Sequence, residues 1–161
     1  MALTIEDGTI VSSANSYVTD AEYVAYAAAR GLTIGSTATL REIELIKSMD
    51  YLQDQDYQGL RTEPDNQMLP FPRIGVFIYG LITDSDNIPK EIKNAQMEGG
   101  IAAYSQDLQV NEVSENVASQ SLQSGMNIAY HNKGSSKRIR LDRVFTWLNP
   151  LLEDAQSLVR A

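Results

Sequence analysis

The most restrictive feature of the sequence is a pair of prolines near its middle, in residues 67–75 (QMLPFPRIG). Proline fixes its own φ, lacks a backbone N–H and disfavours helical geometry in the residue before it. The prolines on either side of Phe71 therefore exclude this point of the chain from any helix. We call residues 67–75 the strap. We expect Leu69 and Phe71 to insert into the core and Arg73 to bind backbone carbonyls or a carboxylate.

Length and composition indicate a single globular domain over residues 1–161. The chain is long enough for one hydrophobic core and too short for two. No apolar run reaches the roughly 20 residues of a membrane span, and the first residues lack the features of a secretion signal, so we expect a protein that is neither membrane-bound nor secreted. The absence of cysteine excludes disulfides and thiolate chemistry, and agrees with synthesis in a cytosol.

The net charge of −8 is unevenly distributed. Residues 1–132 carry 18 acidic and 7 basic side chains, whereas residues 133–143 carry 1 acidic and 5 basic ones. We therefore distinguish an acidic body (1–132) from a basic arm with a C-terminal helix (133–161). The acidic body repels phosphate backbones, because nucleic-acid affinity comes largely from Lys and Arg. A general role of the acidic charge in solubility is the simpler explanation.

The same start signal predicts two helices in the first third of the chain. Thr19 with Glu22 forms a capping box, and Gly31 supplies the left-handed residue that ends a helix over 20–30. Small residues of this helix are expected to form its core face: Ala21, Val24, Ala25 and Ala28. Thr39 with Glu42 repeats the signal for a helix that ends near residue 56, and its apolar face comprises Ile43, Leu45, Ile46, Met49 and Leu52.

A third helix is predicted from Pro89 to about residue 108, with two nearly opposite apolar stripes. Such a helix either runs through the centre of its own domain or is shared with a neighbouring subunit. We predict that one stripe forms a subunit interface through Met97, Ile101 and Tyr104. Glycine costs roughly 1 kcal/mol against alanine inside a helix. The adjacent glycines 99 and 100 therefore indicate a close crossing with another backbone or a bend.

The last third of the chain combines a hairpin, the arm and a final helix. Residues 126–131 alternate at the two-residue period of a strand, and residues 116–122 are placed to pair with them. The Gly/Ser-rich basic residues 133–143 are expected to be flexible. Residues 144–148 are predicted to form a short helical turn, and Asn149 and Pro150 are placed to begin a final helix. This helix packs either on its own bundle or on a partner.

No arrangement of residues in the sequence indicates catalysis. His131 is the only histidine, and without a second imidazole or a thiolate we expect it at the surface and not as a metal ligand or base. A glycosidase-like carboxylate pair is the one catalytic alternative left open. We therefore predict a protein that is not an enzyme and uses no cofactor or metal. The predicted fold is mainly α: a small helical bundle with a short β-hairpin and a C-terminal arm.

Four segments together carry a family resemblance. They are the opening MALTIEDGTIVSSANSYVTDAEYVAYAAARG, the helix that starts at Ile88 and Pro89, the closing NPLL, and the strap residues Gln67, Leu69, Phe71, Pro72 and Arg73. In these segments the chain resembles the head-to-tail connector (adaptor) proteins of tailed phages, including members labelled DnaT-like single-stranded-DNA-binding proteins. Phe71 stands where many members carry Trp.

The resemblance implies a structural protein of the virion neck, between capsid and tail, that is made in the host cytoplasm. Such a protein forms a homo-oligomeric ring, commonly a dodecamer, that docks on the portal protein and extends the DNA channel. It also provides the platform for the next neck or tail component, such as a terminator protein. DNA passes through an acidic lumen without specific binding.

The basic arm and the helix after it are the expected docking site for the portal protein, because an isolated basic stretch on an acidic protein attracts an acidic partner. The residues assigned to this contact are Lys133, Lys137, Arg138, Arg140, Arg143, Leu151 and Leu152. The alternative function is a DnaT-like single-stranded-DNA-binding module. Such modules combine a basic groove with aromatic stacking platforms. Here the basic residues form one short cluster, with no aromatic residue until Phe145 and Trp147, which favours the structural role.

Overall fold

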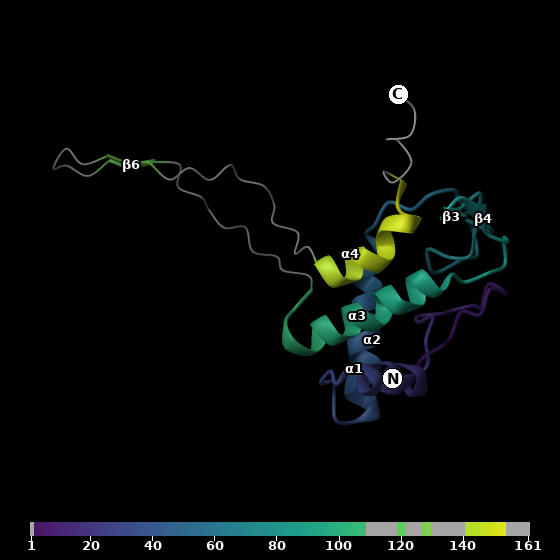
Figure 1. Cartoon of the computed structure of the whole chain (residues 1–161), viewed down its shortest axis with the longest axis horizontal. Helices are drawn as coiled ribbons and strands as arrows, with labels where there is room; N and C mark the ends of the chain where they lie inside the picture. The colour runs from purple at the N-terminus through teal and green to yellow at the C-terminus, as the bar shows by residue number, and fades with distance from the viewer. Residues whose placement is uncertain (1, 109–118, 122–126, 130–140, 154–161) are drawn as a thin grey trace. The chain divides into compact units, whose positions relative to one another are not determined.

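The computed structural model describes residues 2–108, 119–121, 127–129 and 141–153. The chain divides into two compact units, one of residues 1–108 with 140–161, which we call the helical unit, and one of residues 109–139. Within the described residues the helical unit has four α-helices and two antiparallel ribbons, and the second unit has one ribbon (Figure 1). The predicted mainly α fold with a short hairpin is confirmed. None of the helices described is long and apolar enough to cross a membrane.

Helix α1 (Asp20–Arg30) begins and ends where the sequence predicts. Thr19 and Glu22 complete the capping box, and Gly31 ends the helix with φ 62°. The predicted core face is wrong. Tyr23 and Tyr26 are buried together with Ala27, whereas the small residues expected there are exposed: Ala21, Val24, Ala25 and Ala28. The two tyrosines bury a large ring area and their hydroxyls find buried hydrogen-bond partners, which explains the reversed orientation.

Helix α2 (Ala38–Gln53) starts two residues earlier than predicted, because Thr37 caps it and Thr39 does not. The Thr37 hydroxyl accepts a hydrogen bond from the Leu40 amide at 3.3 Å. The helix ends at Gln53 and not near residue 56. Ile46 is partly buried and Ile43 is exposed, but the other predicted core residues are buried: Leu45, Met49 and Leu52.

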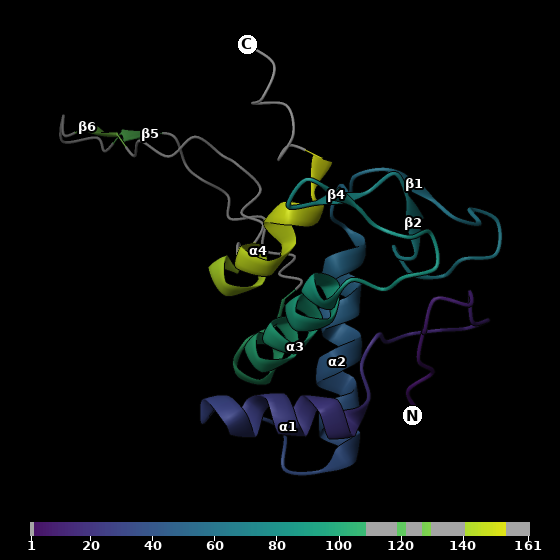
Figure 2. The same ribbon diagram turned by 45° about the vertical axis from the view of Figure 1, so that its right-hand side comes forward.

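Helix α3 (Lys90–Ser105) packs against both α2 and α4 (Figures 1 and 2). A Cβ added at Gly99 would collide with Ser48 on α2, and one added at Gly100 would lie 3.0 Å from the Tyr23 hydroxyl. The close crossing that the two glycines predict is therefore confirmed. Much of α3 is buried, so it runs through the centre of the helical unit, which is the first of the two alternatives predicted for it.

The C-terminal part of the helical unit agrees with the prediction only in part: the helical turn over 144–148 is present within a longer helix, but no α-helix begins at Asn149. Helix α4 (Asp142–Leu148) begins inside the predicted arm and is followed by a 3₁₀ turn, η1 (Asn149–Leu151), where a second helix was expected. Leu152 is already extended. The sequence Asn-Pro is compatible with either a helix start or a short turn, and the buried side chains of this region decide between them. Residues 154–161 lie outside the described part of the chain.

Three short antiparallel ribbons complete the described structure. In the helical unit, β1 (Leu60–Arg61) pairs with β2 (Arg73–Ile74), and β3 (Phe77–Ile78) pairs with β4 (Leu81–Ile82). These two ribbons are too short to show a period in the sequence. In the second unit, β5 (Ser119–Ser121) pairs with β6 (Asn127–Ala129), so the predicted hairpin is confirmed, while its turn and His131 lie outside the described residues.

A buried carboxylate holds the N-terminal segment of the helical unit. Glu6 is 1% exposed and accepts hydrogen bonds from the amides of Gly8, Ile10 and Val11 at 2.8–3.0 Å. Ile5 forms a β-bridge with Ser16. These contacts hold the N-terminal segment in place.

Candidate interaction surface

The strap anchors the two ribbons of the helical unit to the core. Leu69 and Phe71 are each 1% exposed, as the core-inserting interpretation expects. The Phe71 amide donates to the Tyr17 hydroxyl at 2.8 Å, and the Phe71 ring meets the Tyr57 ring edge-on with centroids 5.4 Å apart. The buried Gln67 side chain donates to the carbonyls of Leu69 and Pro72, which closes the strap on itself.

Arg73 joins the strap to the preceding loop. Its guanidinium donates to the carbonyls of Gln58 and Gly59, each at 2.7 Å, and to that of Tyr57 at 3.1 Å. Burial, with the nearby Arg61 charge, lowers the pKa of Arg73. The prediction that this side chain binds carbonyls describes its position correctly. The arginine fixes β1 against β2 and leaves its charge little access to a partner.

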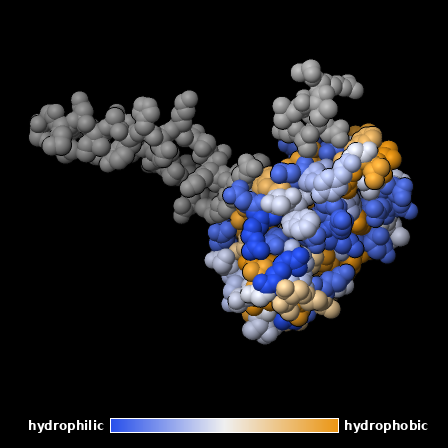
Figure 3. Space-filling model, in the orientation of Figure 1, coloured by the Kyte–Doolittle hydropathy of each residue, from blue (hydrophilic) through white to orange (hydrophobic). Residues whose placement is uncertain are grey.

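The two ribbons present the four most exposed apolar side chains of the described chain, together with two less exposed ones. We call these six residues the ribbon surface: Leu60 (75% exposed), Ile74 (51%), Phe77 (41%), Tyr79 (76%), Leu81 (75%) and Ile82 (66%). Figure 3 shows hydrophobic residues gathered over β3 and β4. The segment that contains most of the surface, residues 74–83, carries no charged side chain. An uncharged, apolar surface is an unusual feature on a protein this acidic.

The predicted subunit interface on α3 is only partly accessible. Met97 is 7% exposed and belongs to the core, whereas Tyr104 is 51% exposed. Ile101 is partly buried and lines a pocket of about 330 Å³ between α3 and the start of α4. On α3 itself, the side chains available to another subunit are therefore Ile101 and Tyr104, and the interface stays a prediction.

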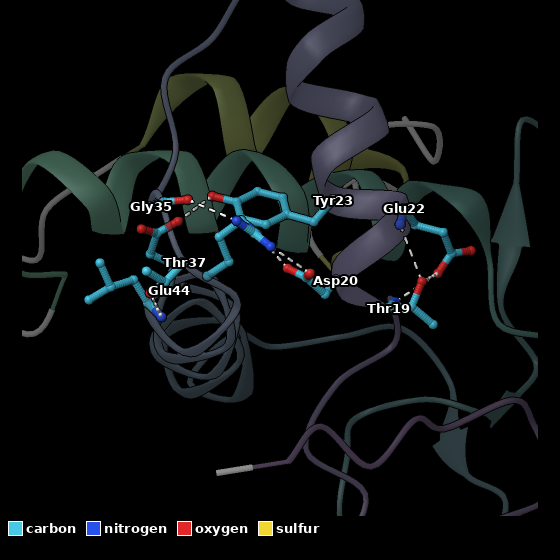
Figure 4. Close-up of polar contacts among 9 residues, drawn as sticks. Thr19, Asp20, Glu22, Tyr23, Gly35, Thr37 and Glu44 are labelled. Atoms are coloured by element: carbon cyan, nitrogen blue, oxygen red, sulfur yellow. Dashed lines mark hydrogen bonds and ion pairs between the residues drawn. The ribbon is translucent and has the colours of Figure 1, made fainter.

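Two buried carboxylates connect the helices of the bundle. The Tyr23 hydroxyl donates to Glu44 on α2 at 2.9 Å, and the Tyr26 hydroxyl donates to Glu98 on α3 at 2.9 Å. Figure 4 shows Tyr23 of α1 directed at Glu44. Burial raises the pKa of Glu44, and burial with the Glu98 hydrogen bond raises the pKa of Tyr26 to about 12. Each carboxylate thus has a partner within the protein, and both fix the helices in place.

Two ion pairs also join helices of the unit. Arg41 on α2 pairs with Asp20 at the start of α1 at 2.6 Å, and the Arg41 hydrogen bond lowers the pKa of Asp20. Arg143 on α4 pairs with Glu98 at 3.2 Å. Within the described residues, no group of three or more acidic or histidine side chains is arranged to hold a metal ion.

The described part of the helical unit has few basic residues, and each of its arginines contacts another part of the protein. The described part of the helical unit carries 18 acidic and 8 basic side chains. All five arginines in it contact the protein itself: Arg30 covers the Tyr26 ring at 3.5 Å, Arg61 donates to the Gln67 carbonyl, and Arg41, Arg73 and Arg143 make the contacts given above. This arrangement offers little positive charge to a phosphate backbone.

The structure places the predicted portal-docking residues in different environments. Arg143 is in α4 with a 62% exposed side chain, Leu151 is buried in the core, and Leu152 forms a β-bridge with Tyr57. Over residues 141–153 the chain therefore packs on its own bundle, which was the alternative to docking. The remaining residues assigned to docking lie outside the described part of the chain: Lys133, Lys137, Arg138 and Arg140.

The fold and its surfaces define a small acidic helical protein with exposed apolar side chains on two β-ribbons. A family model described as "Putative DnaT-like ssDNA binding protein" matches residues 1–161, and the chain belongs to this family. No curated protein and no solved structure matches the chain. Sequence reasoning missed the ribbon surface, for which the only signal was the uncharged run at residues 74–83.

Proposed function

We propose that this chain is a structural assembly protein that binds other proteins, and that it works as a ring-forming adaptor in the neck of a tailed phage. The observation that carries the proposal is the ribbon surface, because an acidic protein with six exposed apolar side chains on two ribbons is built for contact with protein. The ring, the virion neck and the portal protein as partner come from the resemblance of four segments to head-to-tail connectors.

The electrostatics of the helical unit support this proposal. A ring through which DNA passes must not hold it, and an excess of carboxylates gives the phosphate backbone little adhesive contact. The described residues of the unit carry more than twice as many acidic as basic side chains. The structural role needs no catalytic group, cofactor or metal.

The second candidate is single-stranded-DNA binding, and the description of the family favours it. Base stacking on exposed aromatic rings is the chemistry that would serve it. Tyr79 and Tyr104, which are 76% and 51% exposed, are available for stacking. The arginines argue against this candidate because they contact the protein itself. Proteins that stack bases also need positive charge along the nucleic-acid backbone.

One pair of measurements on the full chain separates the two candidates. Mass photometry and negative-stain microscopy, with and without a portal protein, report whether a closed ring forms. A gel shift with single-stranded DNA at roughly 50 mM salt reports electrostatic binding under conditions that favour it. The adaptor proposal expects rings and no micromolar DNA affinity. Salt-sensitive DNA binding by a protein that stays monomeric with the portal protein would establish the second candidate instead.

A further inference from the structure

We infer that the ribbon surface is the contact through which one copy of this chain binds the next. The inference rests on the proposed ring-forming function and names the surface that the ring would use. It assigns to the contact the two ribbons of the helical unit, and not the α3 stripe that the sequence pattern suggested.

The register of the ribbons places the apolar side chains in pairs. Leu60 lies opposite Ile74, and Phe77 lies opposite Ile82. Residues directly opposite each other in an antiparallel pair project to the same face, so each ribbon presents a two-residue apolar step. Only two residues separate Ile74 from Phe77, which keeps the two steps within about 10 Å of each other along the chain.

The exposed area suits a specific contact. A large apolar side chain has about 150–250 Å² to bury. With two fifths to three quarters of each side chain exposed, the six residues offer on the order of 700 Å² in total. Leu81 and Ile82 are successive residues of β4 and project to opposite faces, so a partner contacts both only by enclosing the β3–β4 hairpin. Each partner in a standard protein interface contributes roughly 800 Å².

The charge of the protein favours a second copy as the occupant. Two copies with a net charge of −8 each repel one another wherever their acidic surfaces meet. They can approach closely where neither carries charge, and residues 74–83 form such a segment. A basic partner would instead select the acidic surfaces that cover much of the unit. An apolar, uncharged surface therefore suits a partner that also carries a net negative charge.

The tip of the second ribbon gives an independent indication of function. Tyr79 and Gly80 form a two-residue turn between Ile78 and Leu81, with φ of 51° and 82°. Positive φ at both positions is the requirement of a type I′ turn, in which Asn-Gly is strongly preferred. A tyrosine here is strained, and its side chain is 76% exposed. Strain retained at an exposed aromatic residue indicates that the ring is needed for contact.

Two substitutions in the full chain test the inference. Leu81→Glu places a charge in the surface, and Tyr79→Asn removes the ring while giving the turn its preferred residue. Leu40→Glu is the matched control, because it changes a half-exposed leucine on α2 in the same way, and a carboxylate near a helix N-terminus is tolerated. Sedimentation velocity over a concentration series measures self-association, and thermal unfolding monitored by circular dichroism verifies that each variant is folded.

We expect both ribbon variants to weaken self-association at least tenfold, with Tyr79→Asn melting no lower than the wild type, while Leu40→Glu assembles normally. Assembly of both ribbon variants at wild-type concentrations overturns the inference and leaves the ring proposal intact. A wild type that forms only a closed dimer, lost in the ribbon variants, supports the inference and overturns the ring. A wild type that is monomeric throughout overturns the inference, whereas rings formed only with the portal protein would still support the adaptor function.

Discussion

Ser48 on α2 lies directly against Gly99 on α3, at the point where the two helices cross. The Ser48 hydroxyl donates to the Gln96 carbonyl at 2.8 Å, and the Ser48 Cβ is 3.1 Å from the place where a Cβ of residue 99 would stand. Gln96 in turn donates to the Ser16 hydroxyl and accepts from the Tyr17 amide. This contact joins α2, α3 and the start of the chain, so the spacing of the bundle depends on a glycine at position 99.

Substitution Gly99→Ala is expected to destabilise the protein. Helix propensity alone predicts a gain of about 1 kcal/mol, but forcing a methyl group into a packed crossing costs about 1–3 kcal/mol, and the broken hydrogen bond of Ser48 adds to this. Urea unfolding measures the net change. Gly100→Ala, whose added Cβ has its three nearest neighbours in the Tyr23 side chain, should cost less. A more stable Gly99→Ala variant would show that the helices can separate freely.

Substitution Phe71→Ala should cost about 3–5 kcal/mol in the free energy of unfolding, since the ring is 1% exposed and packs on Tyr57. Phe77→Ala is the control with the same chemical change, because that ring is 41% exposed, and it should cost less than half as much. Chemical denaturation of both variants tests the difference. Equal losses would contradict the role of the strap as a core anchor.

Local signals predict the helices well, and tertiary partners explain the errors. The capping box at Thr19 was found because all its partners lie within four residues. The face of α1 was assigned wrongly because the carboxylates that receive the tyrosine hydroxyls, Glu44 and Glu98, lie 21 and 72 residues away. An amphipathic pattern places glutamate at the surface, and only the fold shows that these two have buried donors.

The candidate surface was harder to predict than the fold. The prolines of the strap made it possible to predict that Leu69 and Phe71 are buried. Leu60 and Ile74 acquire their significance only when β1 pairs with β2, which a pattern of two residues cannot indicate. The stripe on α3 has the correct period, but its Met97 is covered by the same chain, so Ile101 and Tyr104 are the predicted interface residues that remain accessible.

Substitution Glu44→Gln should make stability less dependent on pH. Burial raises the folded-state pKa of Glu44 above its ordinary value of 4.5, so the folded protein holds that proton more tightly than the unfolded chain. The resulting stabilisation is present below about pH 4.5 and is lost as the pH rises through the folded pKa. The melting temperature of Glu44→Gln relative to wild type should therefore be higher at pH 7 than at pH 4.

Asp20→Asn gives the opposite trend and serves as the control. The Arg41 hydrogen bond lowers the folded pKa of Asp20 below its ordinary value of 3.8, so its stabilisation is present above that value and is lost as the pH falls through the folded pKa. The variant should lose more stability at pH 7 than near pH 3. Parallel pH profiles for the two variants would contradict the assignment of Glu44 as a carboxylate destabilised by burial.

Helix α4 belongs to the core of the helical unit, which changes what removal of the C-terminal region should do. Its Val144 and Leu148 are fully buried, as is Leu151 in the turn that follows. Deletion of residues 133–161 removes all three. We expect this deletion to unfold the protein, so it cannot test whether the basic arm binds the portal protein.

Leu148→Ala tests the role of α4 without deletion. Removing a fully buried leucine side chain costs about 2–5 kcal/mol, a large part of the stability of a domain of this size. Thr146→Ala, at an exposed position of the same helix, should change stability by no more than about 0.5 kcal/mol. The free energy of unfolding in urea provides the comparison. If Leu148→Ala unfolds at the wild-type denaturant concentration, α4 contributes little to the stability of the core. Docking on a partner, which the sequence suggested for this region, would then be the better explanation of its apolar side chains.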